Sequence, residues 1–275
     1  MSIIYRKINV KNVLSKTGLY DLDYTYNPYI GCAHGCVYCY ARAYTRYREV
    51  ADSWGKIIYI KENALEVLRR EVYEKTRGVV GVSTITDPYQ YIEAETKLTR
   101  KGIEILLESR RFKISIQTKS PTVLRDLDLF LKFKNNVDVG LTITTVRDDV
   151  AEIIEPNAPP PSSRIDALKK LSEEGLETWI FLGPIMRDVN DSLENIEKIV
   201  ELAQETGSQL YYDFFRIKKN ISRSMKDVKK IYPECMSVNK EWRGKISHLV
   251  ESLCEREGVT CKPAFPKEGY DSKII

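Results

Sequence analysis

Apolar residues recur along the chain in two alternating patterns. Short apolar or alternating runs predict β-strands over residues 23–30, 79–85, 112–118, 137–144, 177–182 and 209–215. Apolar residues spaced three and four apart predict amphipathic helices over residues 64–75, 98–109, 123–133, 164–174 and 193–206. The chain is therefore predicted to be a series of six strand–helix units.

This alternation predicts the fold class. Strands that alternate with helices pair in parallel through right-handed crossovers, and residues 137–144 have the apolar content of a strand covered by helices. Six units are too few for a complete eightfold barrel. We predict an α/β fold, an open, partial (β/α)6 TIM-type barrel, with a doubly wound open sheet as the alternative. In either fold, ligands bind at the carboxyl ends of the strands.

Two composition changes divide the chain. The segment EPNAPPPSSR, residues 155–164, interrupts the helical pattern because consecutive prolines cannot continue a helix, and we predict a rigid loop over the site. Beyond Arg216 the chain becomes rich in lysine, with one further helix predicted over residues 240–257. We predict a barrel domain over residues 1–216 and a C-terminal extension or cap over residues 217–275.

Composition narrows the class of protein. Of 275 residues, 43% are hydrophobic and 30% charged, a balance typical of globular proteins. No apolar run approaches the roughly 20 residues that span a bilayer, and the first residues lack the apolar core of a signal peptide. We expect a cytoplasmic protein with no membrane partner. The net charge of +4 permits a nucleic-acid partner without requiring one.

Half of the six cysteines lie within residues 32–39, in the sequence CAHGCVYC. A reducing cytosol keeps thiols free, so this grouping indicates metal chemistry and not a disulfide framework. Cys32, Cys36 and Cys39 are one short of the four thiolates that complete an ordinary 4Fe–4S cluster, which would leave one iron open to a ligand. Gly31 and Gly35 allow the backbone to curl between them.

Other readings of the cysteines stay open. A structural zinc site needs four ligands, and His34 is the available fourth; three reduced thiols in a surface turn are the simplest alternative. In the tail, Cys235, Cys254 and Cys261 are candidates for an auxiliary iron–sulfur cluster. Free cysteines are also among the commonest buried residues, so these three have a packing explanation as well.

The C-x3-C-x2-C spacing, with Tyr38 just before the last cysteine, resembles the radical S-adenosylmethionine (SAM) superfamily. The resemblance implies that three cysteines hold a 4Fe–4S cluster whose fourth iron binds SAM. One electron then cleaves SAM to methionine and a 5′-deoxyadenosyl radical, which abstracts hydrogen from a substrate. It also implies a partial barrel, a reductant such as ferredoxin or flavodoxin, and a position for Tyr38 near the adenine.

Further blocks narrow the resemblance. Their combination is similar to spore photoproduct lyase-like (DNA repair photolyase-like) proteins, and the likeness spans residues 24–215. The blocks are NPYIGCAHGCVYCYAR at 27–42, TDPYQYIEAETKLTR at 86–100, TKSPTVLRDLDLF at 118–130, LTITT at 141–145 and EPNAPPPSSRIDAL at 155–168.

The resemblance assigns roles by position. Thr86 matches a residue that contacts the SAM amino group, Lys119 a lysine near the SAM carboxylate, and Thr142 another polar contact. Arg164 is a further candidate for an anionic group. A zwitterionic amino acid needs a cation beside its carboxylate and acceptors beside its ammonium. Each of these residues has a helix cap or a surface ion pair as its structural alternative.

One position departs from the family pattern. Spore photoproduct lyase has a hydrogen-donating cysteine where this chain has Thr84, whose O–H bond is too strong to return hydrogen readily to a carbon radical. Tyr89 and Tyr91 are candidates for a hydrogen-atom relay, because phenols form stabilised radicals. With 17 tyrosines in the chain, packing is the alternative role.

Two basic stretches, 41–48 and 216–230, suit phosphate and base contacts, and the first is interleaved with tyrosines. A solvated helix face explains them equally well. The leading hypothesis is a radical SAM enzyme, lyase-like or modifying, that acts on a nucleic acid such as a DNA lesion or a tRNA base. The alternatives are a radical SAM enzyme acting on a small metabolite, lipid or peptide, and a non-catalytic metal-bearing nucleic-acid-binding protein.

Overall fold

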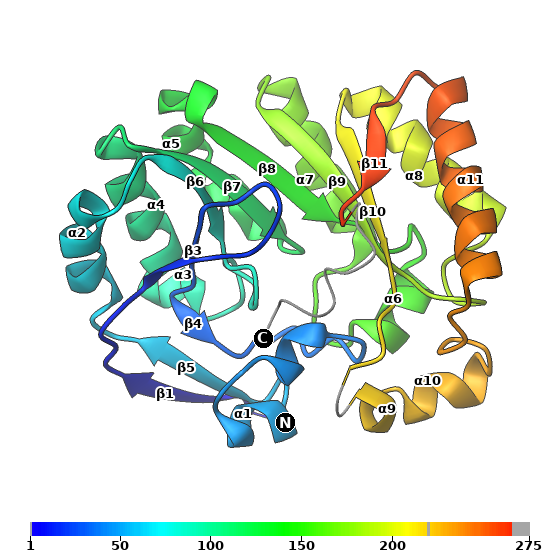
Figure 1. Cartoon of the computed structure of the whole chain (residues 1–275), viewed down its shortest axis with the longest axis horizontal. Helices are drawn as coiled ribbons and strands as arrows, with labels where there is room; N and C mark the ends of the chain where they lie inside the picture. Colours follow the sequence, from blue (N-terminus) through cyan, green and yellow to red (C-terminus); the bar gives the residue numbers. More distant parts are fainter. Residues whose placement is uncertain (1, 219–220, 266–275) are drawn as a thin grey trace.

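A computed structural model describes residues 2–218 and 221–265 of the chain. Within these residues the largest element is a sheet with the strand order β11-β10-β9-β8-β7-β6-β3-β2 (Figure 1). Its strands are β2 (Leu14–Lys16), β3 (Tyr24–Tyr26), β6 (Gly78–Val82), β7 (Phe112–Thr118), β8 (Val137–Thr142), β9 (Glu177–Ile185), β10 (Gln209–Phe214) and β11 (Cys261–Pro263). β2 is antiparallel to β3 and the other neighbours are parallel, so the sheet is mixed.

The order of the parallel strands follows the order of the chain. From β3 through β6, β7, β8 and β9 to β10, each new strand is added on the same side of the previous one. A doubly wound sheet reverses this order at a switch point. The predicted alternative of a doubly wound sheet is therefore wrong, and the α/β fold class is confirmed.

Helices cover one side of this sheet (Figure 1). They are α2 (Ala64–Glu74), α4 (Leu98–Glu108), α5 (Leu127–Lys132), α7 (Pro161–Glu173) and α8 (Leu193–Thr206). Each predicted helix has a counterpart here, although residues 121–126 before α5 form a 3₁₀ helix. Apolar side chains of β6 to β10 and of the covering helices form one buried core. This burial is the main force that fixes the positions of the strand ends.

The first predicted strand, 23–30, is wrong as a single element. It divides into β3 and β4 (Tyr29–Ile30), which belong to different sheets. Pro28 separates them, and proline has no N–H to contribute to a ladder. β4 pairs with β5 (Ile57–Lys61), which also pairs with β1 (Ile4–Ile8). The resulting three-stranded sheet carries the cysteine segment that follows β4.

The proline segment is shorter than predicted. Helix α7 begins at Pro161, so only residues 155–160 lie outside helices, and Arg164 is in the first turns of the helix. Proline suits the first helical position because that N–H has no partner within the helix. The short helix α6 (Asp148–Ile154) precedes this loop.

The C-terminal part joins the main sheet. Helix α11 (Lys240–Arg256) packs on α8, and Trp242, Val250 and Leu253 enter the main core. β11 extends the sheet beside β10. Between β10 and α11, the short helices α9 (Ile221–Ser224) and α10 (Lys226–Ile231) lie at the lower end of the view in Figure 1. No helix of the described residues is long and apolar enough to cross a bilayer.

Candidate active site

The cysteine loop runs from the end of β4 to a 3₁₀ helix, η1 (Tyr40–Ala43). Gly31 and Gly35 have φ of +86° and +61°, a region that favours glycine. A Cβ at Gly31 would lie 2.6 Å from the carbonyl oxygen of Ile57, so a larger residue would push the loop off β5. Backbone bonds from Gly35 N to Cys32 O and from Cys39 N to Cys36 O, both 3.2 Å, close two turns. The loop thereby holds its cysteines on one short, curled backbone.

All three thiols of the loop are free, and those of Cys32 and Cys36 are buried. Burial raises the pKa of Cys36 to about 12 and that of Cys39 above its usual value. The pKa of Cys32 is raised by burial, by Asp87 and then by the neighbouring Cys36 and Cys39 thiols. The three sulfur atoms therefore lie within electrostatic reach of one another. Without a cation among them they remain protonated, and a metal centre would displace the protons.

The number of thiols on the loop bears on the kind of metal centre it could hold. Among residues 2–218 and 221–265, no three His, Cys, Asp or Glu side chains form a group that could hold one metal ion. Three free, neighbouring thiols are the donor set that a 4Fe–4S cluster with one open iron would need.

His34 faces Asp87 and not the thiols. Its Nδ1 lies 3.4 Å from Oδ2 of Asp87, and the ring is buried. Burial lowers the pKa of His34, so the ring is neutral at pH 7. The nearer ring nitrogen and the carboxylate oxygen are in polar contact at this distance. This contact attaches the cysteine loop to the turn after β6.

Asp87 joins this turn to the end of β7. Its Oδ1 accepts hydrogen bonds from Tyr89 N at 2.9 Å and from Thr118 Oγ1 at 2.7 Å. Its Oδ2 accepts from Lys119 N at 2.8 Å. Together with His34, these contacts connect the cysteine loop and the carboxyl ends of β6 and β7 through one buried carboxylate. The predicted residues Thr86 and Lys119, which flank it, are positioned by the same contacts.

Thr86 contacts the cysteine loop directly. Its hydroxyl donates to the carbonyl oxygen of Gly31 at 2.5 Å and accepts from Nε2 of Gln90 at 2.9 Å. Thr142, the last residue of β8, is 3% exposed and accepts from Nε2 of Gln117 at 3.1 Å. The two predicted threonines therefore lie at the carboxyl ends of parallel strands, where ligands of this fold class bind.

Lys119 extends from the end of β7 toward Tyr38. Its Nζ lies 5.7 Å from the centroid of the Tyr38 ring and 3.8 Å from Oε1 of Glu155, and the side chain is 16% exposed. Burial lowers the pKa of Lys119, but Cys36 and Glu155 outweigh this effect, and the pKa is raised. The lysine is a cation next to the cysteine loop at neutral pH.

Glu155 is a buried carboxylate that the sequence did not identify as a site residue. It accepts hydrogen bonds from the hydroxyl of Tyr38 and from Oγ1 of Thr144, the latter at 3.0 Å, and forms an ion pair with Arg164. Burial raises the pKa of Glu155, but Arg164 and Lys119 lower it further, to about 2. Glu155 is therefore ionised and connects Tyr38 to two cations.

Arg164 is fully buried, and each of its three side-chain nitrogens lies against an oxygen. Besides the ion pair with Glu155, Nη1 donates to Thr142 O at 3.1 Å and Nε donates to Pro159 O at 2.8 Å. In this arrangement it contacts the site through Glu155 and the end of β8. The guanidinium stabilises the loop of residues 155–160 through its contacts with Glu155 and Pro159.

The two predicted relay tyrosines have different surroundings. Tyr89 is 2% exposed, lies in the main core, and its hydroxyl donates to Oδ2 of Asp126 at 3.0 Å. Tyr91 is 53% exposed, its hydroxyl donates to Asn157 O at 2.7 Å, and its ring lies 6.2 Å from that of His34. Of the two, Tyr91 packs against the cysteine loop.

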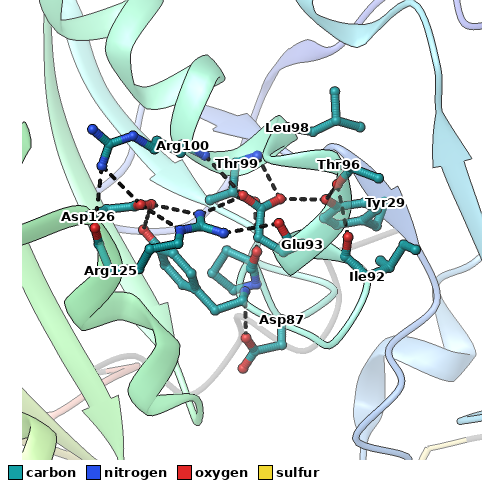
Figure 2. Close-up of polar contacts among 12 residues, drawn as sticks. Tyr29, Asp87, Ile92, Glu93, Thr96, Leu98, Thr99, Arg100, Arg125 and Asp126 are labelled. Carbon is teal, nitrogen blue, oxygen red and sulfur yellow. Dashed lines mark hydrogen bonds and ion pairs between the residues drawn. The ribbon is translucent and has the colours of Figure 1, made fainter.

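A buried ion-pair network anchors the segment that contains Thr86 and Gln90 (Figure 2). Glu93, from α3 (Glu93–Thr96), and Asp126 have fully buried carboxylates. Arg125 bridges them, with Nη2 2.9 Å from Oε1 of Glu93 and Nε 2.8 Å from Oδ1 of Asp126. Arg100 adds a contact of 3.1 Å to Asp126. The network ties residues 87–100 to the start of α5 and keeps this segment rigid.

Of the tail cysteines, Cys254 and Cys261 lie side by side with a side-chain hydrogen bond between them, and Cys235 lies apart from both. Cys235 lies in a hydrophobic cluster with Cys36, Tyr38 and Met225, whereas Cys254 belongs to the main core and Cys261 packs against it. All three are free. The separation of Cys235 from the other two gives no support to an auxiliary cluster that would need all three thiols.

Basic side chains flank the cysteine loop on two sides. Helices α9 and α10 bury Met225 and Val228 in the same cluster as Cys36, and Oγ of Ser224 donates to Val37 O at 2.5 Å. Their outer surface exposes Arg223, Lys226, Lys229 and Lys230. After the loop, the exposed residues include Tyr40, Arg46, Tyr47 and Arg48. Both predicted basic stretches therefore reach the surface beside the cysteines.

Comparisons with known proteins agree with this picture. A model of the radical SAM superfamily matches residues 26–203. An uncharacterized protein of Methanocaldococcus jannaschii is 34% identical over 233 residues, 84% of this chain and 85% of the relative. Spore photoproduct lyase of Bacillus subtilis is 27% identical over 165 residues, 56% of this chain and 43% of that protein.

Solved structures of spore photoproduct lyase mutants share the fold. One, with dinucleoside spore photoproduct, matches 95% of this chain and 81% of its own with a TM-score of 0.72 at 14% identity. Another, with bound AdoMet and dinucleoside spore photoproduct, matches 90% of this chain and 79% of its own with a TM-score of 0.64 at 14% identity. At such identity these matches describe the fold alone.

A mostly parallel α/β sheet with a three-cysteine loop near the carboxyl ends of its strands defines the class as an α/β protein with a candidate metal centre. The chain belongs to the radical SAM superfamily. Membership implies a 4Fe–4S cluster and SAM as cofactors, and the predicted resemblance and enzyme class are confirmed. The hypothesis of a non-catalytic binding protein does not agree with this membership.

Proposed function

We propose that Cys32, Cys36 and Cys39 bind a 4Fe–4S cluster and that the enzyme acts on a nucleic acid at this end of the sheet. The observation that carries the proposal is what surrounds the loop: Thr86 on the Gly31 carbonyl, Lys119 beside Tyr38, and basic helices on Val37. When bound, the cluster would supply the electron that cleaves SAM to methionine and a 5′-deoxyadenosyl radical, which abstracts hydrogen from the substrate.

The protein's own groups would hold the amino-acid part of SAM. Lys119, kept protonated by the negative groups around it, would pair with the carboxylate. Thr86 would accept a hydrogen bond from the amino group, and Thr142, at the end of β8, would add a polar contact. Tyr38 would pack near the adenine, its hydroxyl fixed by Glu155. Arg164 would act indirectly, by holding Glu155 ionised.

The fate of the substrate radical would differ from that in spore photoproduct lyase. Thr84 has no S–H bond to return hydrogen to carbon. Of the two relay candidates, Tyr91 is the better placed because it is half exposed and packs on His34, whereas the hydroxyl of the buried Tyr89 is bonded to Asp126. We propose Tyr91 as a relay and a packing role for Tyr89.

A nucleic-acid substrate has support from charge and from relatives. Exposed arginines and lysines on both sides of the loop can neutralise phosphates, and the exposed rings of Tyr40 and Tyr47 can stack on bases. Spore photoproduct lyase, a relative in sequence and fold, was solved with a dinucleoside spore photoproduct. The proposed substrate is therefore a base within a nucleic acid, and the proposed reaction begins with abstraction of hydrogen from it.

If this surface binds nucleic acid, removing two of its charges will lower the salt dependence of binding. For the double variant Lys226→Gln/Lys229→Gln, we expect the slope of log affinity against log salt on single-stranded DNA to fall by about 1.4 units, because each phosphate contact contributes about 0.7. Fluorescence anisotropy at four salt concentrations measures the slope.

The matched control is Lys113→Gln/Lys170→Gln, which removes two exposed lysines, one near the start of β7 and one in the last turn of α7. This control will leave the slope unchanged. Equal slopes for wild type and Lys226→Gln/Lys229→Gln, or wild-type binding that does not respond to salt on DNA or tRNA, would contradict a nucleic-acid surface here.

The wider organisation fits the same proposal. The stepwise strand order supports an open, partial (β/α)6 barrel over residues 1–216, with residues 217–275 as an extension or cap. The separation of Cys235 from Cys254 and Cys261 supports one cluster per chain rather than two. A cytoplasmic location, where thiols stay reduced, and a one-electron donor such as ferredoxin or flavodoxin complete the proposal.

A further inference from the structure

Gln90 is a fully buried amide at the base of the cysteine loop, and every polar atom of its side chain has a partner. Oε1 accepts a hydrogen bond from Ala33 N at 2.9 Å. Nε2 donates to Thr86 Oγ1 at 2.9 Å and to Gly31 O at 3.4 Å. The side chain therefore contacts the backbone on both sides of Cys32 and the hydroxyl of Thr86.

These contacts determine the orientation of the Gln90 amide. A backbone N–H can only donate, so the atom that faces Ala33 N is the carbonyl oxygen. The amide nitrogen then faces Thr86 and must donate to its hydroxyl oxygen. The direction of this hydrogen bond follows from chemistry alone.

The direction of that bond fixes the hydrogen of Thr86. The hydroxyl cannot direct its own hydrogen back at an N–H donor, and the carbonyl oxygen of Gly31, 2.5 Å away, can only accept. Thr86 thus donates to Gly31 and accepts from Gln90. A hydroxyl has one hydrogen and two lone pairs, so a single lone pair remains for a ligand.

We propose that Gln90 is a positioning residue that fixes Thr86 as a hydrogen-bond acceptor and thereby makes the site selective for a ligand whose amino group presents an N–H to it. The inference rests on the proposed binding of SAM beside Thr86. A hydroxyl that rotates freely could donate to a keto or hydroxyl oxygen as readily as it accepts from an amine N–H. Held by Gln90 and Gly31, it can only accept.

The test compares two ligands on cluster-loaded, oxidised protein, in which no turnover occurs. One ligand is SAM, and the other is its analogue with hydrogen in place of the α-amino group. The dissociation constants of both are measured by equilibrium dialysis for wild type, Gln90→Met, Thr86→Val and the double variant, together with the iron content of each.

Wild type will bind SAM more tightly than the analogue. Gln90→Met will keep its iron, bind SAM about tenfold more weakly and bind the analogue as wild type does, since one buried hydrogen bond is worth roughly that factor. Thr86→Val will also keep its iron, bind SAM about as weakly as Gln90→Met does and bind the analogue as wild type does. The double variant will be no weaker than Thr86→Val alone, because Gln90 acts through that hydroxyl.

A matched control is Asn63→Leu. Asn63, just before α2, is another amide clamp on a backbone, with 2.9 Å bonds to both N and O of Val10 in the segment after β1, and its loss will change neither ligand's affinity. Should Gln90→Met fail to fold, Gln90→Asn, a buried neutral amide too short to reach Thr86, takes its place with the same expectations.

The outcomes separate this inference from the function on which it rests. Wild type that does not bind SAM would overturn the proposed function. Wild type that binds SAM while Gln90→Met keeps wild-type selectivity, weakens both ligands equally or loses iron would overturn the inference and leave the function standing, because Gln90 would then only support the loop.

Discussion

Replacing Cys36 with alanine will reduce bound iron to background and abolish the brown colour of anaerobically reconstituted protein. Wild type will hold close to four irons per chain, the content of one 4Fe–4S cluster. Two thiolates cannot replace three on this loop, because Cys32 and Cys39 are held by turns on either side of Cys36. Iron and acid-labile sulfide, measured per chain, give the result.

Cys235→Ala is the matched control for this variant. Cys235 is fully buried and lies in the same hydrophobic cluster as Cys36, so its replacement removes a thiol of similar burial from the same region. It will keep the iron content of wild type. Two results would contradict the assignment of a single cluster to residues 32–39. One is a full iron content in Cys36→Ala. The other is eight irons per chain in wild type and four in Cys235→Ala.

Arg164→Met will destabilise the protein by about 3–5 kcal/mol, the usual cost of removing one partner from a buried ion pair. Glu155 would remain buried without its principal counter-charge. The pKa of Glu155 is about 2 in the fold against a usual 4.5, so its contribution to stability is present above pH 4.5 and is lost as the pH falls toward 2. Urea unfolding of the iron-free protein at pH 7 measures the loss.

Removing the charge as well will restore stability. Arg164→Met/Glu155→Gln will recover more than half of the loss, because a neutral amide is cheaper to bury than an unpaired carboxylate. The exposed pair of Arg147 and Asp149 serves as the control, and Arg147→Met will cost less than about 1 kcal/mol. A similar small cost for Arg164→Met would show that Glu155 does not depend on its arginine.

Much of the fold could be predicted from periodicity, because local patterns report which faces are buried. Strand β7 and helix α8 appear with the predicted bounds to within a residue. The pattern failed where two elements touch end to end: the apolar run 23–30 hides the change of sheet at Pro28. It also failed at Pro161, which begins a helix where a run of prolines suggested a loop.

The candidate site could be predicted only where its residues lie close together in the sequence. The three cysteines lie within eight residues of sequence, and resemblance located Thr86 and Lys119. Glu155 and Tyr38 are 117 positions apart, so no local pattern indicates that one hydroxyl meets that carboxylate. Gln90 and Asp87 lie within residues 86–100, a segment that carries part of the family resemblance. Their roles nevertheless depend on backbone groups of other segments, which only the folded chain brings near.

One measurement tests the central claim most directly: formation of 5′-deoxyadenosine by cluster-loaded wild-type protein, reduced with dithionite and mixed with SAM under anaerobic conditions. We expect 5′-deoxyadenosine and methionine in equal amounts, detected by liquid chromatography, and none from Cys36→Ala. Protein with a full complement of iron that yields no more 5′-deoxyadenosine than the protein-free mixture, with and without nucleic acid, would contradict the account.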